Sequence, residues 1–249
     1  MPVTKPQSAR TDFPFYNGQP VALSGRDWAL ILLGVALGFA ALLLPFTNAA
    51  ARLIPALLFP LVPLLVLRTV AGPSAWRALF KPIRLGDIGL ALGIALLNIA
   101  VSFTVAWLLT LLFSTNANPV MQLLSQQSAA DRSLFLLSTV PQLLGEEVLT
   151  ILPLLALLTW FHGRLGFSRR KSLVLAWLLS ALPFALVHLP TYQWNLAQCL
   201  LIIGSARLVL SLAYLRSKNL AVAALAHIMN DWLLFGIAAL LGSYAASHS

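Results

Sequence analysis

The sequence has very few charged side chains. Only 9% of its 249 residues are Asp, Glu, Lys or Arg, whereas about a quarter would be usual in a soluble domain. Acidic residues are the scarcest, with seven against sixteen Lys and Arg, while 59% of the residues are hydrophobic and the mean hydropathy is +0.88. This composition excludes an ordinary soluble domain and indicates a polytopic membrane protein.

Cysteine is almost absent as well. Cys199 is the single cysteine, so no disulfide can form within the chain. The net charge of +9 would suit a nucleic-acid-binding protein, but the basic residues lie in the short links between apolar runs, as in membrane proteins. We therefore expect the lipid bilayer as a partner and no nucleic acid.

Apolar runs long enough to cross the roughly 30 Å hydrocarbon layer follow a polar tail at residues 1–25, which we expect to be loose. The sequence thus predicts an all-α fold, a transmembrane helical bundle with about seven spans, in which residues 26–249 form a single domain. The polar link at 114–131 is the longest and is a candidate lid or interfacial element. The predicted spans are 27–46, 51–70, 87–113, 133–160, 172–190, 194–215 and 220–242.

Lysine and arginine are distributed unequally between the two sets of links. Cytoplasmic links of membrane proteins are rich in these residues, so the bias predicts a cytoplasmic N-terminus. We expect the protein in the cytoplasmic membrane of a bacterium. One set holds Lys5, Arg10, Arg26, Arg68, Arg77, Lys81, Arg84, Arg164, Arg169, Arg170, Lys171, Arg216 and Lys218, and the other holds Arg52 and Arg132.

A few ionisable residues lie inside the predicted spans, where they are costly and usually functional. Glu146 and Glu147 are adjacent in the fourth span. Neighbouring residues on a helix point about 100° apart, so one carboxylate should face a reaction centre and the other a structural partner. The remaining polar residues at depth are His188, Arg207, His227, Asn230 and Asp231.

These residues resemble the motifs of the CPBP family of intramembrane proteases (CAAX protease and bacteriocin-processing, or Abi). The family pattern is E-E-x-x-x-R, then F-x-x-x-H, then H-x-x-x-N or D, on three separate transmembrane helices. The resemblance covers about residues 130–235 and implies a protease-like core at about 130–242. The corresponding residues are Glu146, Glu147 and Ile151, then Phe184 and His188, then His227, Asn230 and Asp231.

The chain departs from this pattern at Ile151, where the family has the arginine that would neutralise the second carboxylate. A buried Glu147 then needs another cation. Counted from the ends of their spans, Glu147 and Arg207 differ in depth by less than one helical turn. We therefore hypothesise that Arg207 replaces the missing arginine in space.

The resemblance implies that Glu146, alone or with His188, polarises the water that attacks a peptide bond. His227 with Asn230 or Asp231 would stabilise the tetrahedral oxyanion, and the sequence does not decide between the two. Zinc held by Glu146, His188 and His227 is the rival chemistry. Because H-E-x-x-H is absent, we expect no cofactor.

The resemblance favours an intramembrane endopeptidase that cleaves a membrane-tethered protein or peptide in a C-terminal tail or a leader. Two alternatives remain. The first is a catalytically inactive relative that acts as a binding or immunity factor, which the missing arginine supports. The second is a proton-coupled transporter with the same buried groups as a relay, although internal repeats typical of transporters are not found.

Overall fold

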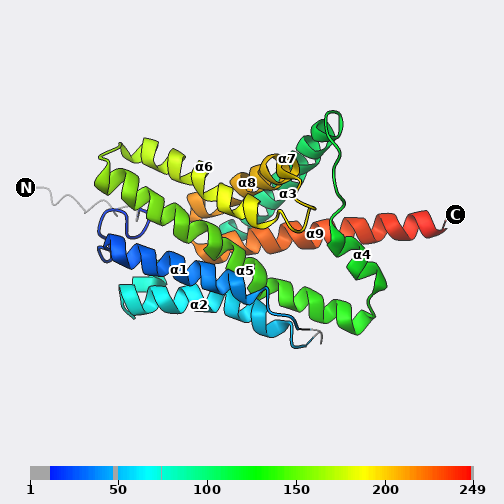
Figure 1. Ribbon diagram of the computed structural model, residues 1–249, viewed down its shortest axis with the longest axis horizontal. Coiled ribbons are helices and arrows are strands. Elements are labelled where there is room, and N and C mark those ends of the chain that lie inside the picture. Colours follow the sequence, from blue (N-terminus) through cyan, green and yellow to red (C-terminus); the bar gives the residue numbers. More distant parts are fainter. Residues whose placement is uncertain (1–11, 47–49, 74, 248–249) are drawn as a thin grey trace, which may run out of the picture.

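The computed structural model describes residues 12–46, 50–73 and 75–247, and this part of the chain is a bundle of helices without strands (Figure 1). The prediction of an all-α fold is confirmed. The long helices are α1 (Gly25–Ala41), α2 (Leu53–Ala71), α3 (Leu85–Thr110), α5 (Ala129–Thr159), α6 (Arg169–Val187), α8 (Gly204–Ser217) and α9 (Leu220–Ser247); the short ones are η1 (Ala75–Leu79), α4 (Pro119–Gln126), η2 (Trp160–Arg164), α7 (Leu196–Gln198) and η3 (Cys199–Ile203).

Each of the seven predicted spans lies on one of these helices or helix pairs. Six helical segments in the described residues are long and apolar enough to cross a membrane, so the chain is an integral membrane protein. The remaining predicted span lies on α1, which is shorter, with 17 residues. The predicted link at 114–131 is partly helical, because it holds α4 and the first turn of α5.

Serine side chains fix where several helices begin. Ser24 accepts a hydrogen bond from the Asp27 backbone, and the Asp27 carboxylate accepts one from the Ser24 backbone, which closes a capping box at α1. Ser128 caps α5, and Ser168 caps α6. These caps satisfy backbone groups that the first helical turn leaves without partners.

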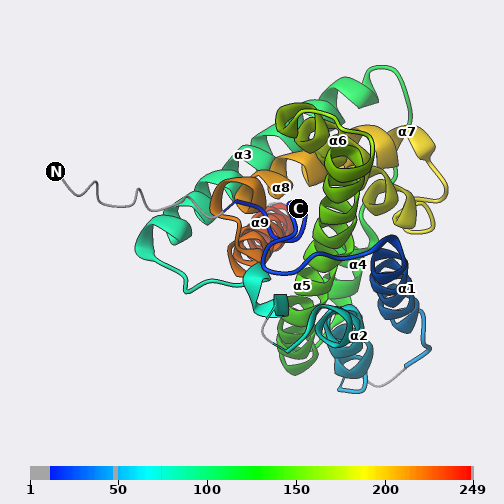
Figure 2. The ribbon, with the colours of Figure 1, turned by 90° about the vertical axis from the view of Figure 1, so that its left-hand side faces the viewer.

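Helix α5 is the centre of the bundle and contacts α1, α2, α6, α8 and α9 (Figure 2). In the most apolar stretch of α5, 61% of the residues are buried, whereas 22–39% are buried in the corresponding stretches of the other five candidate spans. A close contact with α2 requires glycine at Gly145, since a Cβ there would lie 2.5 Å from the Phe59 ring. The carboxylates that follow Gly145 are therefore carried on the most enclosed helix.

The links that hold most of the basic residues meet at one end of the bundle, on the left in Figure 1. There the Asn219 amide donates to the Lys81 carbonyl at 2.8 Å and accepts from the Lys81 backbone N–H at 3.2 Å. This pair joins the link before α3 to the turn between α8 and α9.

Residues 12–24 are packed onto this end of the bundle, unlike the loose tail expected from the sequence. Phe13 and Phe15 are buried, and Tyr16 is nearly so. Phe13 packs on Tyr214 of α8, and Phe15 packs edge-on against Trp28 of α1. The aromatic residues account for this difference, since they bury apolar area that a polar tail would lack. Residues 1–11 of the predicted tail lie outside the described part of the chain.

An ion pair holds this N-terminal segment to α6. Asp12 accepts hydrogen bonds from Arg169 Nε at 2.6 Å and from Tyr16 Oη at 2.6 Å. The hydrogen bonds from Arg169 hold the pKa of the Asp12 carboxyl well below its usual range. The contact therefore stabilises the fold only while Asp12 is ionised.

We expect Asp12→Asn to lower the melting temperature at pH 7, and to lower it by progressively less as the pH falls below about 4. The folded pKa of Asp12 lies below the unfolded value of about 3.9, so its contribution is complete above that value and is lost as the pH falls through the folded pKa. The test is the difference in melting temperature between variant and wild type across this range. Asn17→Ser, in the same segment, should show no such pH dependence; a constant difference for Asp12→Asn would contradict the expectation.

Candidate functional site

The site is built around Glu147, which is fully buried on α5. Arg207 of α8, also fully buried, donates from Nη1 to Glu147 Oε1 at 2.6 Å and from Nη2 to Oε2 at 3.0 Å. This two-pronged geometry is the strongest that a guanidinium and a carboxylate can form. The contact expected between Arg207 and Glu147 is therefore present, while Ile151, where the family pattern has its arginine, is buried.

Glu147 also positions His227 of α9. The Nδ1 atom of His227 lies 2.8 Å from Glu147 Oε1 and, because a carboxylate oxygen only accepts, must donate its hydrogen there. The other ring nitrogen, Nε2, then points away from Glu147, towards Glu146 and Asp231. One buried carboxylate thus holds α5, α8 and α9 together and sets the orientation of the imidazole.

Phe184 of α6 links the ion pair to His188. The Arg207 guanidinium carbon lies 4.9 Å from the centre of the Phe184 ring, a cation–π contact, and the His188 ring is 4.7 Å from it. His188 ends α6, with Nδ1 donating to the Phe184 carbonyl at 2.7 Å, so its Nε2 is left to act on other groups. Pro183 lies inside α6 without ending it.

Glu146 has surroundings unlike those of its neighbour. Its side chain is 13% exposed, whereas Glu147 is fully enclosed. Gln142, one turn earlier on α5, donates to Glu146 Oε1 at 3.2 Å, and His227 Nε2 lies 3.8 Å from Oε2. Glu146 has no arginine or lysine within ion-pair distance among the described residues. Glu146 is therefore a partly exposed carboxylate whose neighbours are Gln142 and His227.

Asn230 and Asp231 extend the cluster along α9. Asp231 Oδ1 lies 3.7 Å from His227 Nε2 and accepts a hydrogen bond from Asn230 Nδ2 at 2.9 Å. Asn230 in turn accepts from Asn98 Nδ2 of α3 at 2.9 Å. The Asp231 side chain is 26% exposed, whereas both asparagines are buried. The Asn230 amide is thus engaged on both sides, and Asp231 is the more exposed member of this pair.

Asn98 was not predicted from the sequence, because it is not ionisable. A neutral amide in the middle of an otherwise apolar span was the available signal, because such a group needs a buried partner.

Tyr192, in the link after His188, was also missed. The ring is buried, and burial raises the pKa of Tyr192 to about 12, with the nearby acidic groups of Asp231 and Glu146 adding to the shift. The phenol therefore keeps its proton at neutral pH and can donate a hydrogen bond towards the carboxylates. Its position four residues after His188 was the only indication in the sequence.

The zinc alternative does not fit these side chains. Over the described residues, no three or more His, Cys, Asp or Glu side chains converge as a metal site requires. His227 and His188 each donate from Nδ1 to a protein oxygen, so Nε2 is the one ring nitrogen that either could offer to an ion.

We expect Arg207→Ala to lower the free energy of unfolding by about 3–5 kcal/mol, because it leaves the charge of Glu147 buried and unpaired. The measurement is thermal or denaturant unfolding in detergent. A variant as stable as wild type would contradict the structural role of the pair.

Two double variants provide the controls. Arg207→Ala with Ile151→Arg returns a cation one turn after Glu147 and should restore part of the lost stability. Arg207→Met with Glu147→Gln removes both charges and should also be more stable than Arg207→Ala. If Arg207→Met with Glu147→Gln were no more stable than Arg207→Ala, the loss would not depend on the charge of Glu147, and packing alone would explain it.

Comparison with known families agrees with this geometry. A family described as type II CAAX prenyl endopeptidase Rce1-like matches residues 129–233, from the start of α5 to the second residue after Asp231. No curated protein and no solved structure matches the chain. The matched segment carries all six predicted catalytic residues and Arg207. Residues 129–233 are therefore a domain of the Rce1-like type II CAAX prenyl endopeptidase (CPBP) family, a family of proteases.

Proposed function

We propose that the chain is an intramembrane endopeptidase that cleaves a membrane-tethered protein or peptide, with Glu146 as the base that activates water. The observation that carries this proposal is the contrast between two adjacent carboxylates. Glu147 is enclosed and neutralised by Arg207, whereas Glu146 is partly exposed and has no such cation. Only Glu146 is free to take a proton from a substrate water.

Peptide hydrolysis needs a base for the water, a donor for the oxyanion and an acid for the leaving amine. In the proposed reaction Glu146 takes a proton from water, and the hydroxide attacks the scissile carbonyl carbon. When the carbon–nitrogen bond breaks, the same proton passes from Glu146 to the amine. Gln142 supports this role by holding the carboxylate at Oε1.

His227 is the proposed donor for the oxyanion. Its Nδ1 hydrogen is committed to Glu147, so Nε2 must also be protonated for this role. Nε2 lies 3.8 Å from Glu146 and 3.7 Å from Asp231. The Tyr192 phenol is a further donor, whereas His188 donates from Nδ1 to the Phe184 carbonyl and offers Nε2 as an acceptor for the water. Asp231, when ionised, orients His227 and does not donate.

The family description suggests a lipidated C-terminal tail as the substrate, since it names a CAAX prenyl endopeptidase. A membrane-spanning bundle suits such a substrate, because the lipid would bring the peptide to the membrane. We propose a cytoplasmic N-terminus in a bacterial cytoplasmic membrane, on the basis of the basic links that meet at one end of the bundle. The proton-coupled transporter alternative gains no additional support from the fold or from the site.

We expect Glu146→Gln to abolish cleavage and to leave the melting temperature close to that of wild type. Loss of a general base lowers rates by roughly 10²–10⁴-fold, and Gln keeps the shape of the side chain. The measurement is cleavage of a farnesylated C-a-a-X peptide by purified protein in detergent, with an unprenylated peptide of the same sequence alongside.

The matched control is Asp87→Asn, which changes an acid at the start of α3 outside the site and should cleave at the wild-type rate. Cleavage by Glu146→Gln at the wild-type rate would contradict the role of Glu146. No cleavage of either peptide by wild type, together with specific binding of the prenylated one, would favour the inactive relative instead.

A second prediction concerns Asn98, which we propose as a positioning residue acting through Asn230. Asn98→Leu leaves the Asn230 carbonyl oxygen without its donor, so we expect kcat to fall roughly tenfold with little change in KM. Steady-state kinetics on the same peptide provide the test. Thr104→Val is the control on α3, because that hydroxyl bonds only to its own helix. An equal effect on kcat for both variants, or an effect on KM alone, would contradict the proposal.

A further inference from the structure

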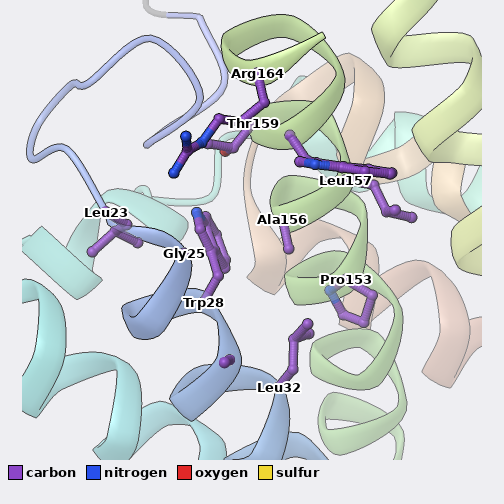
Figure 3. A pocket seen from close by; sticks show the side chains of 11 residues that line it. Leu23, Gly25, Trp28, Leu32, Pro153, Ala156, Leu157, Thr159 and Arg164 are labelled. Atoms are coloured by element: carbon purple, nitrogen blue, oxygen red, sulfur yellow. The ribbon is translucent and has the colours of Figure 1, made fainter.

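A groove separate from the candidate site lies between α1 and the end of α5 (Figure 3). It has a volume of about 460 Å³, which is within the roughly 300–1,000 Å³ of cavities that bind small organic molecules. Arg164, at one end of the groove, is eighteen residues beyond Glu146, or about 27 Å along the helix. None of the predicted catalytic residues lines the groove, which is therefore distinct from the candidate site.

The walls of the groove are apolar, and its polar atoms are few. Leu32 of α1 and Pro153, Ala156 and Leu157 of α5 form the apolar part. Such an apolar wall on a membrane protein suits a hydrocarbon chain, because neither the wall nor the chain interacts favourably with water.

Two nitrogen donors without partners lie towards one end. Trp28 is 6% exposed, yet its Nε1 has no hydrogen-bond partner in the described part of the chain. Buried indole N–H groups are normally bonded, so this donor points to an absent acceptor. Arg164 is exposed and pairs with no carboxylate among the described residues. In Figure 3 the Trp28 nitrogen and the Arg164 guanidinium are directed to the same end of the groove.

We propose that this groove binds an anionic phospholipid, with one acyl chain against the apolar walls and the phosphate between Arg164 and the Trp28 N–H. Arginine binds phosphate through a fork of two N–H groups, and the indole N–H supplies a third donor.

Charge complementarity selects this occupant. Arg164 is the one ionisable side chain among the residues that line the groove, and none of them is acidic. Asp27, the nearest acid in the α1 sequence, is bound in the capping box with Ser24. The groove therefore presents a single positive charge beside the N-terminal end of α1, where the helix dipole adds to it.

The position of the groove also suits a lipid. Trp160, on its rim, is 51% exposed, as tryptophans at the membrane interface usually are. The groove lies at the end of the bundle that carries the basic links, where anionic headgroups would be attracted. The phosphate would sit at headgroup level and the acyl chain at the depth of the hydrocarbon layer.

The test measures the melting temperature of purified protein in detergent as phosphatidylglycerol or phosphatidylcholine is added. We expect phosphatidylglycerol to raise it in a saturable manner and phosphatidylcholine to raise it much less. Native mass spectrometry should then show one retained phosphatidylglycerol. Inorganic phosphate should produce no shift, which distinguishes a lipid site from a phosphate site.

Arg164→Gln should weaken phosphatidylglycerol binding roughly tenfold, and Trp28→Phe, which keeps a ring but removes the N–H, roughly fivefold. Arg170→Gln, a basic residue beyond the groove, is the matched control and should bind as wild type does. Ala29→Phe should exclude the acyl chain without altering any charge.

Equal stabilisation by the two lipids, or equal losses in Arg164→Gln and Arg170→Gln, would overturn the proposal. Both results concern lipid binding and are independent of peptide cleavage.

Discussion

The rest of the site depends on the charge of Glu147, a carboxylate with no exposure to solvent. Enclosing a charge is costly unless hydrogen bonds and an opposite charge satisfy it. Here Arg207 supplies both, and His227 supplies one further hydrogen bond. Three helices must therefore approach within hydrogen-bond distance of a single side chain. Compared with apolar side chains of similar volume the ion pair adds little net stability, but it restricts α5, α8 and α9 to one arrangement.

That arrangement separates the tasks of two adjacent residues. Glu146 and Glu147 point about 100° apart on α5, so one faces the packed interior and the other a space with some access. Two adjacent residues of one helix can thus have different roles, one as a structural acid and the other as a reactive acid. The same logic applies to Asn230, which is enclosed and bonded on two sides, and Asp231, which is more exposed.

Much of the fold could be predicted because hydropathy determines which segments cross a membrane. The partner of Glu147 was also predictable, since depth along two helices is a count of residues. Asn98 could not be identified in this way, because a neutral amide carries no charge to mark it. Depth in the membrane is harder to predict, because α5 and its terminal turn run for 36 residues, about 54 Å, so the ends of this helix lie beyond a 30 Å layer. The packing of Phe13 and Phe15 required the structure, because local polarity alone suggested a tail.

The π-helical turn Cys199–Ile203 lies immediately before α8, and it has a consequence for how such proteins are compared. A turn of this kind contains one more residue than an α-helical turn and so shifts the phase of everything that follows. The direction of Arg207 is therefore fixed by the winding of its helix, not by its distance in sequence from Glu147. A search that demands an arginine four residues after the second glutamate would reject this chain, although the cation is present in space.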